Sequence, residues 1–218
     1  MIPHFAFSQT LLNSWDRIDD ENKKKFIKII EDQSNRLINL VENILTVSKS
    51  NAENTVMKKV DVNFLIEKVI PVIKEQHKTH KFIFEPDKKL PPARLDEDKF
   101  QQIMTNLIDN GGKYSPEGSS ITISTRLAGD IISIKIKDEG VGIKKDDFDK
   151  LFQKFSRLEN HLTSKTQGNG LGLYITKQLV EKMNGEILLE SEENKGSTFE
   201  VRFPVYNEEE ALKCSQKS

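Results

Sequence analysis

The apolar residues of positions 20–49 recur every three or four residues, with charged and amide side chains between them. This period indicates one amphipathic helix of about 30 residues with a single apolar stripe. The acidic pair Asp19-Asp20 offers an N-cap for it. A stripe of this length is buried only against other helices. Its members are Phe26, Ile27, Ile30, Leu37, Ile38, Val41, Ile44 and Leu45.

A shorter amphipathic stretch, from Phe7 to Trp15, precedes this helix. We therefore predict a helical hairpin over residues 1–49. A hairpin of two helices is too thin to bury a core by itself, and two hairpins from two chains commonly complete a four-helix bundle. The hairpin is thus expected to dimerise. The alternative is a hairpin that packs on its own chain.

Residues 48–59 have no apolar period and are rich in polar and small side chains, which is typical of a linker. The expected organisation has four parts. They are the hairpin (1–49), the linker (50–59), a second domain (60–204) and a polar tail (205–218).

The second domain alternates helical and strand patterns. Helices are expected over residues 63–76, where Pro71 interrupts the pattern, from about Asp96 onward, and over residues 171–183. Strands are expected over residues 81–85, in two alternating isoleucine runs joined at Gly129-Asp130, and in two runs after Gly185. This mixed order indicates an α+β sandwich whose sheet has helices on one face.

The composition excludes several classes of protein. The 218 residues carry 33 Lys and Arg against 34 Asp and Glu, whereas nucleic-acid or anionic-membrane binding requires a basic excess. The single Cys214 excludes an intramolecular disulfide. No run reaches the roughly 18 apolar residues of a membrane span. We expect a soluble, cytoplasmic chain that meets a membrane only through segments absent from it, and no nucleic-acid partner.

Two glycine-rich motifs lie in the second domain. Asp138-Glu139-Gly140-Val141-Gly142-Ile143 ends a strand with a carboxylate and then two glycines, which allow close approach of the backbone. Gly168-Asn169-Gly170-Leu171-Gly172-Leu173 opens a helix, where free N–H groups favour phosphate oxygens. Each motif alone is equally compatible with an ordinary turn.

A third motif places Asn106 and Asn110 four residues apart on one helical face, with Lys113 one turn further on. Two amides beside an ammonium group suit a metal–triphosphate. An amphipathic helix with outward polar residues is the alternative, but it does not explain why the asparagines lie near an apolar stripe. A fourth motif, residues 151–157 (LFQKFSR), precedes a polar loop over residues 158–167.

In this order and spacing, the motifs resemble the ATP-binding domain of sensor histidine kinases of two-component systems. NLIDNGGKYS resembles the N box, DEGVGI and GNGLGL the first two glycine boxes, LFQKFSRL the F box, and KGSTF the third glycine box. The resemblance implies the Bergerat α/β sandwich that gyrase, Hsp90 and MutL share. It extends weakly to residues 7–49, which are similar to the family's dimerization helices.

The resemblance also implies roles for single residues. Asp138 would accept a hydrogen bond from the adenine amino group. Asn110 would be the metal ligand, an oxygen donor to Mg²⁺, and Asn106 would assist it. Lys113 and Tyr114 would contact phosphate or ribose.

Further roles fall on the loops. Arg157 would stabilise charge on the transferred phosphoryl group, so that the catalytic set is Asn106, Lys113 and Arg157. Residues 158–167 would close as a lid over the nucleotide. The remaining implied ATP contacts are Gly140, Gly142, Ile143, Phe155, Gly168, Gly170, Leu171, Gly172 and Thr198. Gly111-Gly112 stand where many relatives carry Ala and a larger residue, which is expected to loosen the helix end by about 1 kcal/mol per glycine.

The position of Asn106 bears on the reaction. In the hydrolysing relatives a Glu stands four residues before the metal-binding Asn, and an amide cannot take a proton from water. A neutral imidazole acceptor needs less activation. We therefore expect phosphoryl transfer from Mg-ATP to a histidine and onward to an aspartate of a response regulator receiver domain. The alternative is an ATP-gated conformational or interaction module without kinase activity.

The acceptor histidine is not evident. In the family it is followed by Glu or Asp and lies about a dozen residues before the position that Phe7 matches by resemblance. His4 has no acidic neighbour, and His77, His80 and His161 are expected to be surface residues. We therefore expect a kinase core cut off inside its first bundle helix, in which autophosphorylation of the isolated chain is weak.

Overall fold

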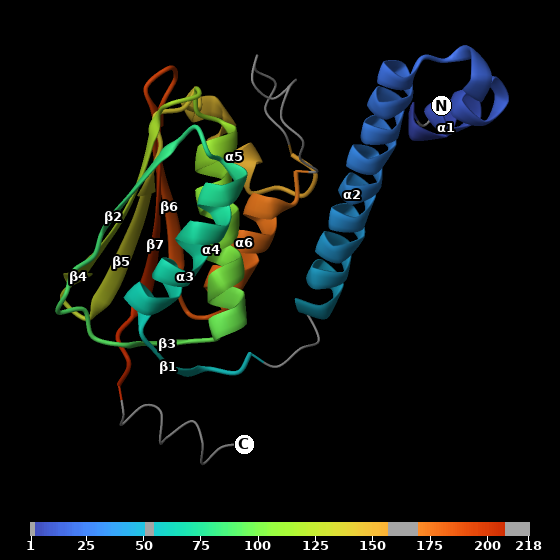
Figure 1. Cartoon of the computed structure of the whole chain (residues 1–218). Helices are drawn as coiled ribbons and strands as arrows, with labels where there is room; N and C mark the ends of the chain where they lie inside the picture. Colours follow the sequence, from blue (N-terminus) through green and yellow to red (C-terminus); the bar gives the residue numbers. More distant parts are fainter. Residues whose placement is uncertain (1–2, 51–54, 157–169, 208–218) are drawn as a thin grey trace. The chain divides into compact units, whose positions relative to one another are not determined.

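The computed structural model describes residues 3–50, 55–156 and 170–207. The chain divides into two compact units, residues 1–49 and 50–218 (Figure 1). The predicted Arg157, Gly168 and the loop over residues 158–167 lie outside the described residues.

The first unit is a helical hairpin, as predicted. Helix α1 (Pro3–Ser14) leads through the short helix η1 (Trp15–Arg17) to α2 (Asp20–Ser50). Asp19 caps α2, because its Oδ1 accepts a hydrogen bond from the Asn22 amide at 2.9 Å. The rings of Phe7 and Phe26 join the arms, with centroids 5.1 Å apart. Further along α2, stripe residues remain about half exposed, namely Ile27, Leu37, Ile38 and Val41.

The second unit is built on a five-stranded sheet with the order β2-β4-β5-β7-β6. These strands are β2 (Lys81–Glu85), β4 (Ser120–Ala128), β5 (Ile131–Lys137), β6 (Glu186–Glu192) and β7 (Gly196–Pro204). Strand β2 is parallel to β4, and the other pairs are antiparallel. The alternation in β4 and β5 turns one set of isoleucines into the core, namely Ile121, Ile123, Ile132, Ile134 and Ile136.

Three helices cover one face of this sheet (Figure 1): α3 (Val62–Gln76), α4 (Glu97–Lys113) and α6 (Gly172–Lys182). Helix α4 packs against both α3 and α6. Its core side includes the fully buried Phe100, Ile103 and Leu107. The short helices η2 (Lys145–Asp147) and α5 (Phe148–Leu151) follow the first glycine motif. The predicted α+β sandwich is confirmed.

Two details differ from the sequence expectations. Pro71 lies inside α3 without interrupting it. Pro71 and Glu67, whose carbonyl loses its helical donor, are both exposed, so water can hydrate that carbonyl. The predicted linker is also shorter at its far end, because Lys58 and Lys59 belong to strand β1 (Lys58–Val60), which pairs with β3 (Ala93–Leu95).

Candidate nucleotide site

Asp138 follows β5 directly and is buried. Its Oδ1 accepts two backbone hydrogen bonds, from Gly140 N at 2.8 Å and from Ser197 N at 3.1 Å. Burial raises the pKa of this carboxyl group to about 6, and the two backbone bonds oppose that rise. Among the described residues, none donates a hydrogen bond to Oδ2. One carboxylate oxygen is therefore fixed by the backbone and the other is available to a ligand.

The glycines of the first motif allow the loop after Asp138 to lie against the turn between β6 and β7. Gly142 has a φ of +64°, and a methyl group there would overlap the Glu192 carbonyl oxygen. The loop is held by the Asn194 amide, which donates to the Val141 carbonyl at 2.7 Å. Ile143 contributes its amide to the Ser191 hydroxyl at 2.9 Å.

The third motif occupies the C-terminal half of α4, and its two asparagines differ in their contacts. Asn106 donates from Nδ2 to the Thr176 hydroxyl of α6 at 2.6 Å, and Gly172 packs directly against its Oδ1. The half-buried Asn110 makes no side-chain hydrogen bond with the described part of the chain. Asn106 therefore fixes the start of α6 against α4, and the Asn110 amide oxygen is free for a ligand.

Asp138 lies beside Gly111, the residue that follows Asn110. A methyl group at Gly111 would lie 3.7 Å from Asp138 Cβ and 3.3 Å from an Ile121 methyl carbon. The helix therefore lies close to β4 and Asp138 at residue 111, where an alanine would require the Ile121 side chain to shift by a few tenths of an ångström. The two glycines were expected to loosen the helix end, whereas here Gly112 leaves the space that the His77 ring occupies.

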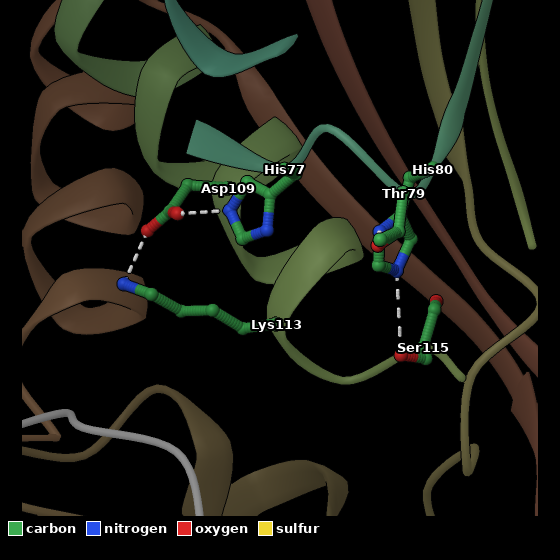
Figure 2. Close-up of polar contacts among 6 residues, drawn as sticks. All are labelled: His77, Thr79, His80, Asp109, Lys113 and Ser115. Carbon is green, nitrogen blue, oxygen red and sulfur yellow. Dashed lines mark hydrogen bonds and ion pairs between the residues drawn. The ribbon is translucent and has the colours of Figure 1, made fainter. Parts of the chain in front are cut away.

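Lys113 and Tyr114 close α4. Lys113 forms an ion pair with Asp109 Oδ2, and His77 Nε2 lies 2.8 Å from Asp109 Oδ1 (Figure 2). Tyr114 is the C-cap, and its carbonyl accepts from the Val141 amide at 3.1 Å, which ties the first glycine motif to the end of α4.

The expectation that His77 and His80 lie on the surface is wrong. His80 is buried and sits 3.4 Å from the Ser115 carbonyl through Nε2, and the His77 side chain is largely covered. Their position after the end of a helix was the only sign in the sequence that these histidines could be covered. Neither histidine is as exposed as a phosphoryl acceptor needs to be.

Of the remaining predicted site residues, Gly170, Leu171 and Phe155 lie around the start of α6. Gly170 has a φ of +69°, and a methyl group there would lie 2.6 Å from the Ser156 carbonyl oxygen, so Gly170 and Ser156 lie against each other. Phe155 is 62% exposed. Leu171 is the buried N-cap of α6. Thr198 lies on β7 opposite Lys137, the residue before Asp138.

Thr176, Asp109 and His77 were missed by sequence reasoning. A threonine within the buried face of α6 was the available sign for Thr176, which is almost fully buried beside Ile175. Asp109 lies inside the third motif, but its partners come from α3 and α4 and are set by packing.

Residues 95–207 match the family described as histidine kinase-, DNA gyrase B- and HSP90-like ATPases, over more than half of the chain. The chain belongs to this ATPase family. Two curated relatives are sensor histidine kinase WalK of Bacillus subtilis and histidine-protein kinase ArlS of Staphylococcus haemolyticus. They are 35% and 31% identical over 87% and 88% of this chain, which spans 32% and 43% of their lengths.

Solved structures agree on the fold of this ATPase-family chain. The histidine kinase AdeS of Acinetobacter baumannii matches 94% of the chain with a TM-score of 0.74 and 24% identity, over 96% of its own length. The histidine kinase ThkA, solved in complex with the response regulator TrrA, matches 94% with a TM-score of 0.76 and 23% identity, over 58% of its length. Among the described helices, none is long and apolar enough to cross a membrane.

Proposed function

We propose that this chain is the ATP-binding catalytic core of a sensor histidine kinase in a two-component system. The observation that carries the proposal is the position of Asp138 beside Gly111, the residue after Asn110 in α4, with one oxygen of Asp138 and one of Asn110 available to a ligand. The family assignment supports ATP as that ligand. The curated relatives that align with most of the chain are named as histidine kinases.

Adenine is the base that this site would select. Asp138 Oδ2 would accept from the adenine amino group while Oδ1 stays on the amides of Gly140 and Ser197. A carboxylate cannot donate to the carbonyl that guanine has in the same place. GTP is therefore expected to bind more weakly than ATP.

The residues present also fit a magnesium ion. Mg²⁺ binds in proteins through few side-chain oxygens, together with waters and substrate phosphates. The Asn110 amide oxygen, which has no partner among the described residues, is one such ligand. Bound Mg²⁺ would neutralise charge on the phosphates. Lys113, at the same helix end, would contact a phosphate oxygen.

The chain's residues favour transfer to a histidine over hydrolysis. Asn106, committed to Thr176, is an amide and cannot act as a base toward water. In the proposed transfer the acceptor's imidazole nitrogen forms the N–P bond, the bond from the γ-phosphorus to the bridging oxygen breaks, ADP leaves, and the imidazolium proton passes to solvent. Arg157, outside the described residues, would stabilise the charge on the moving group.

The acceptor and the partners are part of the proposal. His77 and His80 are unsuitable because one is paired with Asp109 and the other is buried. We propose that a histidine on a complete bundle helix accepts the phosphoryl group in trans, with relay to a receiver-domain aspartate in the cytosol. ThkA, which shares the fold, was solved with a response regulator.

Incubation with γ-labelled ATP tests this function. The chain alone should bind Mg-ATP and gain little acid-labile phosphate. Added to a helical hairpin fragment that carries an intact acceptor histidine, it should label that fragment, and Asn110→Ala should abolish the labelling. ATP binding without any transfer would instead favour the ATP-gated module, and phosphohistidine mapped to His4 would identify His4 as the acceptor.

A further inference from the structure

His77 connects α3 to the end of α4. It is the C-cap of α3, where its amide donates to the Ile73 carbonyl at 3.0 Å. Its ring lies over Gly112, whose added methyl group would come within 2.8 to 2.9 Å of ring atoms. The ring then reaches Asp109, with Nε2 at 2.8 Å from Oδ1. The His77 and Asp109 side chains are 15% and 18% exposed, so water competes little for this hydrogen bond.

Asp109 is held from two sides. His77 of α3 contacts one carboxylate oxygen, and Lys113 of α4 pairs with the other (Figure 2). A lysine side chain is a flexible stem with a point charge at its end, so its position depends on what holds the ammonium group. In this structure Asp109 holds it, and the orientation of Asp109 depends in turn on His77.

We propose that His77 is a positioning residue for the nucleotide phosphates, acting through Asp109 on Lys113. The inference rests on the proposed function, in which Lys113 meets a phosphate oxygen. Without the His77 bond, Asp109 can rotate toward solvent or bind Lys113 alone. In either case less of the Lys113 charge is placed where phosphate arrives. Partners that orient a binding group in this way are a general feature of charged sites.

A packing role for His77 makes a different prediction. If the ring only fills the space over Gly112, an aromatic ring without nitrogen would serve equally well. If the hydrogen bond to Asp109 matters, a side chain that keeps a donor near Nε2 would serve better. His77→Phe keeps the ring, and His77→Gln keeps the donor, so the two variants separate these roles.

Competition against a fluorescent ADP analogue measures the effect in the full chain, with Mg-ATP, Mg-ADP and adenosine as competitors. His77→Phe should weaken Mg-ATP and Mg-ADP by about tenfold, the loss typical of a hydrogen bond to a charged group. Adenosine, which has no phosphate, should stay within about twofold. His77→Gln should restore Mg-ATP binding to within about threefold of the unaltered chain.

Two further variants test whether the effect of His77 passes through Asp109 to Lys113. In a Lys113→Met background, His77→Phe should cause no additional loss, because the group that it positions is gone. Gly112→Ala should reproduce the phosphate-selective loss, because its methyl group displaces the His77 ring. Thermal unfolding of each variant accompanies the binding data.

The possible outcomes separate the two proposals. An unaltered chain that binds neither Mg-ATP nor Mg-ADP defeats the proposed function. If it binds them, an equal loss of adenosine and ATP affinity in His77→Phe overturns the positioning role. The positioning role is also overturned if His77→Phe keeps Mg-ATP affinity while His77→Gln loses it. It is overturned likewise if His77→Phe weakens Mg-ATP binding as much in the Lys113→Met background as in the unaltered chain.

Discussion

At the scale of single residues, Asp138 is a buried carboxylate with one oxygen fixed and one available. We predict that Asp138→Asn lowers ATP affinity by about 1.5 to 3 kcal/mol, because the amide nitrogen in place of Oδ2 cannot accept from the adenine amino group. Calorimetry with ATP and GTP measures the change. Glu139→Gln, the equivalent carboxylate-to-amide change at the exposed neighbouring position, should leave ATP affinity unchanged. Equal ATP and GTP binding by the unaltered chain would contradict the assignment.

The raised pKa of Asp138 predicts a pH dependence of folding. Burial raises this pKa from 3.8 to about 6, so the folded state binds the proton more tightly than the unfolded state. The stability that the protonated group contributes is therefore lost as pH rises through about 6, at a cost on the order of 2 to 3 kcal/mol in the ionised state.

Asp138→Asn, which cannot ionise, should consequently be more stable than the unaltered chain at about pH 8, with a smaller difference at about pH 5. Denaturant unfolding at the two pH values gives the free energies. A difference that does not change between them would show that the Asp138 charge is not the cause. ATP affinity should decrease as the pH is lowered through about 6, because the adenine amino group needs the ionised carboxylate as its acceptor.

At the scale of elements, the contact between α4 and α6 includes a partly buried polar pair. Asn106 of α4 donates to Thr176 of α6 at 2.6 Å, and Gly172 lets the first turn of α6 approach. The start of α6 is thus placed by α4 rather than by its own sequence. Gly170 and Leu171 directly precede this turn, so their position follows from the same contact.

Thr176→Val should lower the free energy of unfolding by about 1 to 3 kcal/mol, because the shape is kept while Asn106 Nδ2 loses its acceptor in a partly buried place. Denaturant unfolding followed by circular dichroism measures it. Thr105→Val is the matched control, since Thr105 lies on the exposed face of the same α4. A cost at position 105 as large as that at position 176 would argue against the role of the hydrogen bond.

At the scale of the whole molecule, α2 presents an apolar stripe that is half exposed at Ile27, Leu37, Ile38 and Val41. Exposed apolar residues in a continuous row are typical of an interaction surface. A second copy of the hairpin would complete a four-helix bundle with it. This dimer is the assembly that we propose for the chain.

Sedimentation should therefore show a concentration-dependent dimer. Ile38→Glu should shift it to monomer, because a charge in the bundle core is desolvated without a partner. Lys25→Glu changes an exposed residue outside the stripe, just before its first member Phe26, and should leave the dimer intact. Mg-ATP binding should survive in the monomer, since Asp138 and Asn110 lie in the second unit alone. A chain that is monomeric at all concentrations would exclude the bundle.

The sequence by itself determined the features that depend on neighbours along the chain. The three- and four-residue period predicted α2, the isoleucine alternation predicted β4 and β5, and Asp19 and Asp96 cap the helices that follow them. The order of the motifs also predicted the family, and the mixed order of helix and strand patterns predicted the α+β class. The helices, strands and caps follow from periodicity and hydrogen bonds among residues that are close together in the sequence.

Only the tertiary structure decided which distant groups meet. His77 reaches Asp109 across 32 positions and Asn106 reaches Thr176 across 70, so no local pattern records either contact. Lys58 and Lys59 become a strand because β3 supplies a partner, and Pro71 is tolerated because its side of α3 faces solvent. The partners of His77 and Asn106 belong to positions in the folded chain, and tertiary packing sets them.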